Sequence, residues 1–189
     1  MERRCHLALL FGLIAGSLAA QTPAPKSTMD RLIVYGSDFV FGVKEPEGWT
    51  GNSGEAATKY HVNIVFFPVA EPSRAADLTI RVRVNGKVDE DTAEDLKFDL
   101  QHYKKDYPKA VFSDLRALHP EYRTFSKLVY VPGDFYEYIV YVNPGPQSKI
   151  AFSVAMSKMS APATPNELKA FESVLKSLVW LSNSATIQK

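Results

Sequence analysis

The sequence contains a single cysteine, Cys5, and it lies before the apolar stretch that follows the first residues. Residues 1–20 have the three parts of a secretory signal peptide, so cleavage would remove Cys5. We therefore expect a mature chain without a disulfide, a thiolate nucleophile or a cysteine metal ligand. An exported domain without disulfides must be held together by its hydrophobic core alone.

Net charge is also nearly absent. The chain has 22 basic and 21 acidic residues, and removal of Glu2, Arg3 and Arg4 with the signal leaves 20 of each. A neutral protein has no bulk field that attracts nucleic acid or an anionic membrane. We expect neither among its partners, which leaves another envelope protein or a small ligand.

Catalytic and metal-binding motifs are missing as well. There is no H-E-x-x-H, G-x-S-x-G, phosphate-binding loop or paired Cys/His spacing, and His61, His102 and His119 stand far apart. Ser173 and Lys176 match S-x-x-K, but its companion motifs are absent and the serine lies in an amphipathic helix pattern. The sequence therefore predicts no catalytic residue, no metal site and no cofactor. An enzyme would need a spatially assembled site with one histidine beside an acid in a cleft.

The N-terminus predicts where the protein works. A basic start leads into the apolar residues Leu7–Ala15 and then into small residues up to Ala20. This stretch is shorter than the roughly 20 apolar residues that span a bilayer, so we expect cleavage after Ala19 or Ala20 and no transmembrane segment afterwards. The protein would then be periplasmic or secreted. The predicted organisation is a signal peptide (1–20), a flexible proline-containing tether (21–29), one α+β domain (30–182) and a disordered tail (183–189).

Strand patterns dominate the domain. Residues 62–67 are almost wholly apolar, which predicts a strand buried on both faces. Residues 78–84 alternate apolar with polar side chains, which predicts a strand with one face in water. Further strands are expected at 32–35, 39–43, 111–117, 123–131, 135–142 and 150–157. Turn residues at 132–134 and 143–146 predict that the last three form an antiparallel meander.

Two amphipathic helices are expected. The first begins at Asp91, with Glu94 as its capping-box partner, and ends before Pro108. The second begins at Thr164 with Glu167 completing a capping box, and its apolar spacing continues to about Leu181. Small side chains on one face of 151–157 would let a helix lie close to that strand. The fold class is therefore α+β, an antiparallel sheet of about six or seven strands with helices on one or both faces.

Residues 39–49, FVFGVKEPEGW, resemble the opening of PsbP-like proteins and of the related DcrB-type envelope proteins. The shared features are a strand of the form F-x-V followed by P-x-G-W, early in an exported domain. The order of strands, helix, meander and terminal helix is similar over nearly the whole mature chain. The resemblance implies a non-enzymatic three-layer α/β/α domain, often an accessory or scaffold module. No residue here matches one that carries the photosystem II role of PsbP itself.

Two features are candidate recognition surfaces. The loop 48–54 has a glycine at every third position beside Trp49, so we expect it to be mobile and able to close over a ligand. The alternative is a plain turn with Trp49 packed into the core. Arg81 and Arg83 project from the wet face of their strand and could form a fork for a carboxylate or phosphate. The alternative is a solvated face with acidic partners across the strands.

An aromatic run within 135–141 is the third candidate surface. Tyr136 and Tyr138 would lie on one face of the strand, with Phe135, Ile139 and Tyr141 on the other. If helices cover both faces of the sheet, all five residues belong to the core. If one face is bare, the tyrosines would line a surface for a partner or ligand.

These observations favour a non-catalytic exported accessory or binding module in the cell envelope or outside the cell. One alternative is a carrier that holds a small apolar ligand between the sheet and the C-terminal helix. A third hypothesis is the enzyme with a spatially assembled site.

Overall fold

A computed structural model describes residues 31–70, 77–88 and 90–182. The predicted signal peptide, tether and tail lie outside the described residues. The helices are α1 (Glu55–Lys59), α2 (Ala93–Asp106) and α3 (Pro165–Ser177). The strands are β1 (Leu32–Tyr35), β2 (Val40–Val43), β3 (Trp49–Asn52), β4 (Ile64–Pro68), β5 (Leu78–Gly86), β6 (Val111–Asp114), β7 (Arg123–Tyr130), β8 (Phe135–Asn143), β9 (Ile150–Met159) and β10 (Val179–Ser182).

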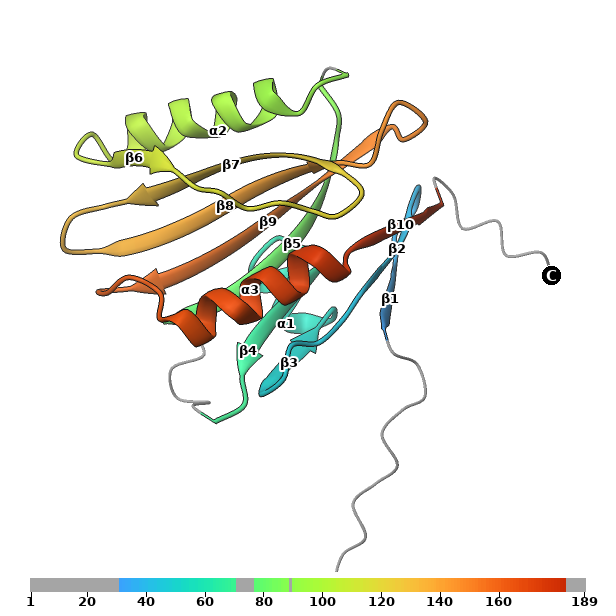
Figure 1. The fold of residues 1–189 in the computed structure, drawn as a ribbon, viewed down its shortest axis with the longest axis horizontal. Coiled ribbons are helices and arrows are strands. Elements are labelled where there is room, and N and C mark those ends of the chain that lie inside the picture. Colours follow the sequence, from blue (N-terminus) through green and yellow to red (C-terminus); the bar gives the residue numbers. More distant parts are fainter. Residues whose placement is uncertain (1–30, 71–76, 89, 183–189) are drawn as a thin grey trace, which may run out of the picture.

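A seven-stranded antiparallel sheet forms the middle of the domain, in the order β3-β4-β5-β9-β8-β7-β6. The meander predicted for the last three long strands is confirmed as β7-β8-β9. A separate three-stranded sheet has the order β1-β2-β10, so the first and last strands of the described chain lie on the two sides of β2 (Figure 1). The α+β class is therefore correct, and the second sheet is an addition that the sequence did not predict.

Helices cover both faces of the large sheet. Alternate side chains of a strand point to opposite faces, so each face contributes its own residues to a core. On β8, Tyr138 and Val140 belong to a core beneath α3, whereas Ile139 and Tyr141 belong to a second core beneath α2. The strand β2 adds Phe41 to the first core. Figure 1 shows α2 and α3 on the two sides of the sheet. The arrangement has three layers.

The helix α3 begins as predicted and ends earlier than predicted. The Thr164 hydroxyl accepts a hydrogen bond from the Glu167 amide, and the Glu167 carboxylate accepts one from the Thr164 amide, so the capping box is formed. The extension to Leu181 is wrong. Leu178 has extended backbone angles (φ −63°, ψ 128°), and the residues after it pair with β2 as β10.

The start of α2 differs from the prediction. Thr92, rather than Asp91, is the N-cap, and no capping box with Glu94 forms. The Asp91 carboxylate instead accepts a hydrogen bond from the Ala93 amide and lies 3.1 Å from an Arg123 guanidinium nitrogen. These contacts hold the Asp91 carboxylate beside the first turn and β7, which is why it does not reach the third amide of the helix.

Most of the segment expected as a loop at 48–54 is a strand, because Trp49–Asn52 form β3 and pair with β4. Gly48 has a positive φ of 76° in the tight turn before the strand, where a side chain would be strained. A Cβ on Gly51 would lie 2.8 Å from side-chain atoms of both Leu32 and Phe66. Gly51 is therefore explained by close packing rather than by mobility. The short helix α1, which follows β3, was not predicted.

Candidate functional site

A hollow on the described surface lies beside the first turns of α3. It has a volume of about 1020 Å³, and its walls come from the start of β3, the ends of β4 and β9, the start of β5 and the helix α3. We call it the α3 groove. Its lining mixes apolar, polar and charged side chains, among them Trp49, Leu78, Lys158, Met159, Glu167 and Ser173. Five segments distant in sequence thus form one concave surface.

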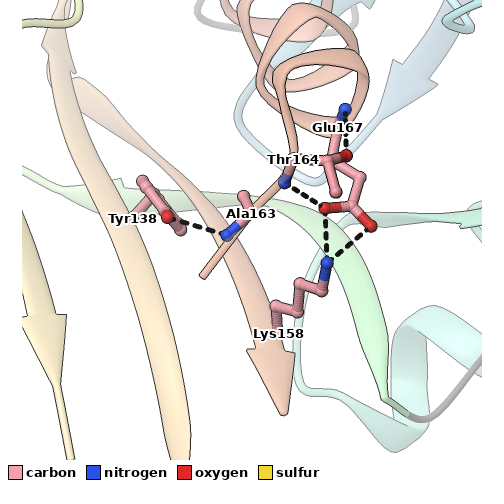
Figure 2. A network of polar contacts seen from close by, with 5 residues as sticks. All are labelled: Tyr138, Lys158, Ala163, Thr164 and Glu167. Carbon is pink, nitrogen blue, oxygen red and sulfur yellow. Dashed lines mark hydrogen bonds and ion pairs between the residues drawn. The ribbon is translucent and has the colours of Figure 1, made fainter. Parts of the chain in front are cut away.

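An ion pair lies on the wall of the α3 groove, where β9 meets the start of α3 (Figure 2). The Lys158 ammonium lies 2.7 Å from one Glu167 carboxylate oxygen and 2.9 Å from the other. The same carboxylate accepts the Thr164 amide at 2.6 Å, so it joins the strand, the helix and the cap. Both charged side chains are about four-fifths buried, with exposed fractions of 18% and 19%.

The electrostatics of Glu167 follow from these contacts. Burial acts to raise its pKa, but the hydrogen bonds from Lys158 and Thr164 together outweigh burial and hold the pKa below its ordinary value. The carboxylate is therefore ionised at neutral pH, and Lys158 remains its counter-ion. The groove offers a ligand a polar wall in which both charges are already compensated.

Trp49 fits both interpretations of its role. Its indole packs against the core beneath α3 and also lines the α3 groove, and the side chain is half-buried. Its backbone amide donates to the Pro46 carbonyl at 3.1 Å, which fixes the turn that presents it. Trp49 is thus an apolar wall of the groove that also packs against the core.

The two tyrosines on β8 lie on the α3 side of the sheet, as the alternation predicted. Tyr138 is buried beneath α3, and its hydroxyl accepts the Ala163 amide at 3.0 Å just before the helix (Figure 2). Tyr136 stacks on Tyr130, with ring centroids 4.4 Å apart. Tyr138 is therefore a core residue that also supports the entry into α3, whereas Tyr136 lies farther along the same face.

Arg81 lies on the other side of the sheet, where its guanidinium forms an ion pair with Glu137 on β8 and donates to the Ser157 hydroxyl on β9. The Tyr103 hydroxyl, from α2, donates to the second oxygen of Glu137. Burial raises the pKa of Tyr103, and the neighbouring Glu137 charge and hydrogen bond raise it further. We call these four residues the Glu137 network. For Arg81, the structure therefore agrees with the alternative to a ligand-binding fork, in which the arginine has an acidic partner on another strand.

Small residues on β9 make this contact possible. Arg81 is paired in register with Ala155, and Glu137 with Ser157. Because these β9 side chains are short, the arginine can lie across β9 and reach β8. On this face the short β9 side chains accommodate the arginine, and the helix α2 packs mainly on β7 and β8. Arg83, two residues after Arg81, is exposed.

The sheet therefore separates the sequence-predicted candidates into two groups. Trp49, Tyr136 and Tyr138 lie on the α3 side, whereas Arg81 and Arg83 lie on the α2 side. One concave site containing both Trp49 and the arginines is excluded. Sequence reasoning missed Lys158 as a groove residue and Glu137 as a buried acid. The available signal for Glu137 was a lone carboxylate within the apolar run of 135–142.

The histidines do not form a cluster. His102 and His119 each contact a backbone carbonyl, of Phe98 and Leu178 respectively. Among the described residues, no group of three or more His, Cys, Asp or Glu side chains is placed to hold a metal ion. In the same part of the chain, no helix is both long and apolar enough to span a membrane.

The buried His119 makes stability depend on pH. Its Nε2 lies 2.8 Å from the Leu178 carbonyl, while Nδ1 accepts two backbone amides at 3.0 Å each. Burial lowers the pKa of His119 below its ordinary 6.5, so the unfolded chain binds more protons below that pH. The free energy of unfolding should therefore fall as the pH falls below 6.5. Urea unfolding between about pH 7.5 and about pH 5.5 measures this slope.

His119→Gln should remove most of that slope, whereas His102→Gln should leave it unchanged because His102 is exposed. Glu167 does not interfere, since its pKa lies below 4.5. Equal slopes in the two variants would show that His119 is not the group responsible.

No protein-family model matches the chain, and no curated protein matches it either. The site must therefore be interpreted from its own geometry. A groove of this size, lined by an indole, other apolar side chains and polar groups held in place by hydrogen bonds, has properties of a small-ligand site. It can orient a ligand through Lys158, Glu167 and the polar side chains of α3.

Proposed function

We propose that the protein is a non-catalytic binding module, exported to the cell envelope or beyond it, that holds a compact amphipathic ligand in the α3 groove. The observation that carries the proposal is the composition of the groove, in which Trp49 and Leu78 face the same space as the Lys158–Glu167 pair. An apolar part of the ligand would contact the indole, and a polar part would lie against the ion pair. The export pattern of residues 1–20 supports the location.

Two further observations support this proposal. The resemblance of residues 39–49 to PsbP-like and DcrB-type domains implies an accessory role without catalysis. The groove also lies beside α3, where the carrier hypothesis places its ligand. Charged side chains at Glu47, Asp77 and Lys169 line the groove too, and they favour a ligand with a polar end over a purely apolar one.

Fluorescence of Trp49 tests the proposal. The chain has two tryptophans, so Trp180→Phe leaves Trp49 as the sole indole. The probe is 1-anilinonaphthalene-8-sulfonate, which combines an aromatic body with a charged group. We expect its titration to change Trp49 emission with saturation. Adding Ser173→Phe should weaken binding by about tenfold or more, because a phenyl ring there fills the groove.

Glu172→Phe in the same background is the matched control. Glu172 is the neighbouring exposed residue of α3, and it pairs with Lys176 instead of lining the groove. Its binding should stay within about twofold of the parent. An equal loss in both variants, or saturable binding that neither changes, would mean that the α3 groove is not the site.

A further inference from the structure

A second concave surface lies on the α2 side of the sheet. In Figure 1, α2 lies near the edge strand β6. This groove has a volume of about 360 Å³. Its apolar lining includes Leu96, Leu100, Phe112 and Phe125, and its rim includes Lys97, Lys104 and Lys127. We call it the β6 groove. It is apolar along its floor and basic along its rim.

The outer side of α2 is left uncovered because the sheet ends at β6. Ala93, Lys97, Leu100 and Lys104 are spaced by three or four residues, so they lie on one side of the helix, and all four line the groove. Because the lining also includes Phe125 and Lys127 of β7, the groove lies over the outer two strands of the sheet, and a strand added next to β6 would extend the sheet beside the groove.

The two edges of the sheet differ in their hydrogen bonding. At the β3 edge, two backbone amides have partners within the chain: the Glu45 carboxylate accepts the Gly51 amide at 2.6 Å, and the Pro46 carbonyl accepts the Trp49 amide. At β6, the backbone pairs with β7 on one side, and its outer groups make no hydrogen bond within the described part of the chain. An open strand edge is a template for strand addition.

The charges at the rim define the chemistry of an added strand. Lys97 pairs with Glu94, and Lys127 pairs with Asp114. Lys104 lines the groove and has no ion pair among the described residues, so its charge is left for a ligand. An acidic segment would complement this rim, whereas a second copy of the chain would place the same lysines against it.

We propose that the β6 groove is a docking site for an extended acidic segment of a partner protein, which adds as a strand to β6. Alternate side chains of that segment face α2: apolar ones contact Leu100 and Phe112, and acidic ones reach the lysines of the rim. Backbone hydrogen bonds to β6 provide affinity, and the groove provides specificity. The site is independent of the α3 groove, because the sheet separates them.

The test uses a displayed library of random peptides of about twelve residues, long enough to pair with a whole strand. The library is panned on the folded domain, and the peptide enriched most is labelled and titrated by fluorescence anisotropy. We expect enriched sequences that alternate apolar and acidic residues. Their binding should weaken with salt, and hydrogen exchange of the β6 amides should slow in the complex.

Two charge reversals on α2 locate the binding. Lys104→Glu should weaken the peptide by about tenfold, whereas Lys105→Glu should change it by less than about twofold. Lys105 is the matched control because it is exposed, carries the same charge in the same helical turn and does not line the groove. Both variants place an acid near the C-terminus of α2, so their effects on helix stability are alike.

Three results would overturn the proposal. The first is an enriched set without acidic residues or without alternation. The second is an equal loss of binding in the two variants. The third is a dimer, detected by analytical sedimentation without peptide, in which the β6 amides are already protected, since that would make a second copy the occupant.

Discussion

Glu137→Ala is expected to lower the free energy of unfolding by about 3 kcal/mol. The Glu137 side chain is 7% exposed and accepts hydrogen bonds from Arg81, Tyr103 and Ser157. Its removal leaves the arginine without its counter-ion beneath α2, and leaves two hydroxyls without an acceptor. Arg81 is 24% exposed, so water screens part of its charge and we expect the lower end of the usual range.

Glu172→Ala is the control for Glu137→Ala. Glu172 also pairs with a cation, Lys176, but both side chains are about half exposed, so we expect a loss below about 0.5 kcal/mol. The double variant Arg81→Met/Glu137→Met should be more stable than the two single changes predict together, because it removes both charges. Urea unfolding of the parent, the single variants and the double variant measures these changes in the free energy of unfolding. A loss for Glu137→Ala no larger than that for Glu172→Ala would contradict the network.

Phe171→Ala is expected to cost about 3 to 4 kcal/mol of unfolding free energy. Phe171 is 2% exposed on α3 and lies against Tyr138, with ring centroids 6.4 Å apart. Truncation removes the ring and leaves a cavity between helix and sheet that the rigid strands cannot fill. The thermal midpoint should fall by several degrees as well, on the scale expected for a domain of this size.

Phe98→Ala provides the comparison for Phe171→Ala. Phe98 is 61% exposed on α2 and contacts the His102 ring, so its truncation should change the unfolding free energy by less than about 0.5 kcal/mol. Similar losses for the two variants would mean that α3 does not pack on the sheet as described.

The elements that could be predicted are those with local signals. The Thr164–Glu167 capping box predicted the start of α3, and the alternation in residues 78–84 and 150–157 predicted β5 and β9. By contrast, Leu178 and Leu181 continue the apolar spacing of α3, so the pattern predicted more helix. Pairing with β2, more than 130 residues earlier in the chain, makes that segment a strand. Such long-range pairing has no local signal.

In the candidate site too, single residues could be predicted from local signals, but the contacts between distant segments could not. Trp49 was identifiable because a tryptophan beside glycines is conspicuous, but its surroundings come from five separate segments. Arg81 was identified as well, yet its partner Glu137 is 56 residues away and on the next strand but one. Neither the groove nor the network could be predicted without the order of strands in the sheet, and Trp49 is separated from Arg81 because the two side chains lie on opposite faces of it.

The small sheet at the ends of the domain has a mechanical consequence. Both β1 and β10 run antiparallel to β2, so they point in the same direction on its two sides. The chain enters β1 beside Val43 and leaves β10 beside Val40, at opposite ends of β2. Tension between the two termini therefore shears both ladders lengthwise. Their hydrogen bonds, which lie across the strands, would share the load and break together instead of opening one at a time.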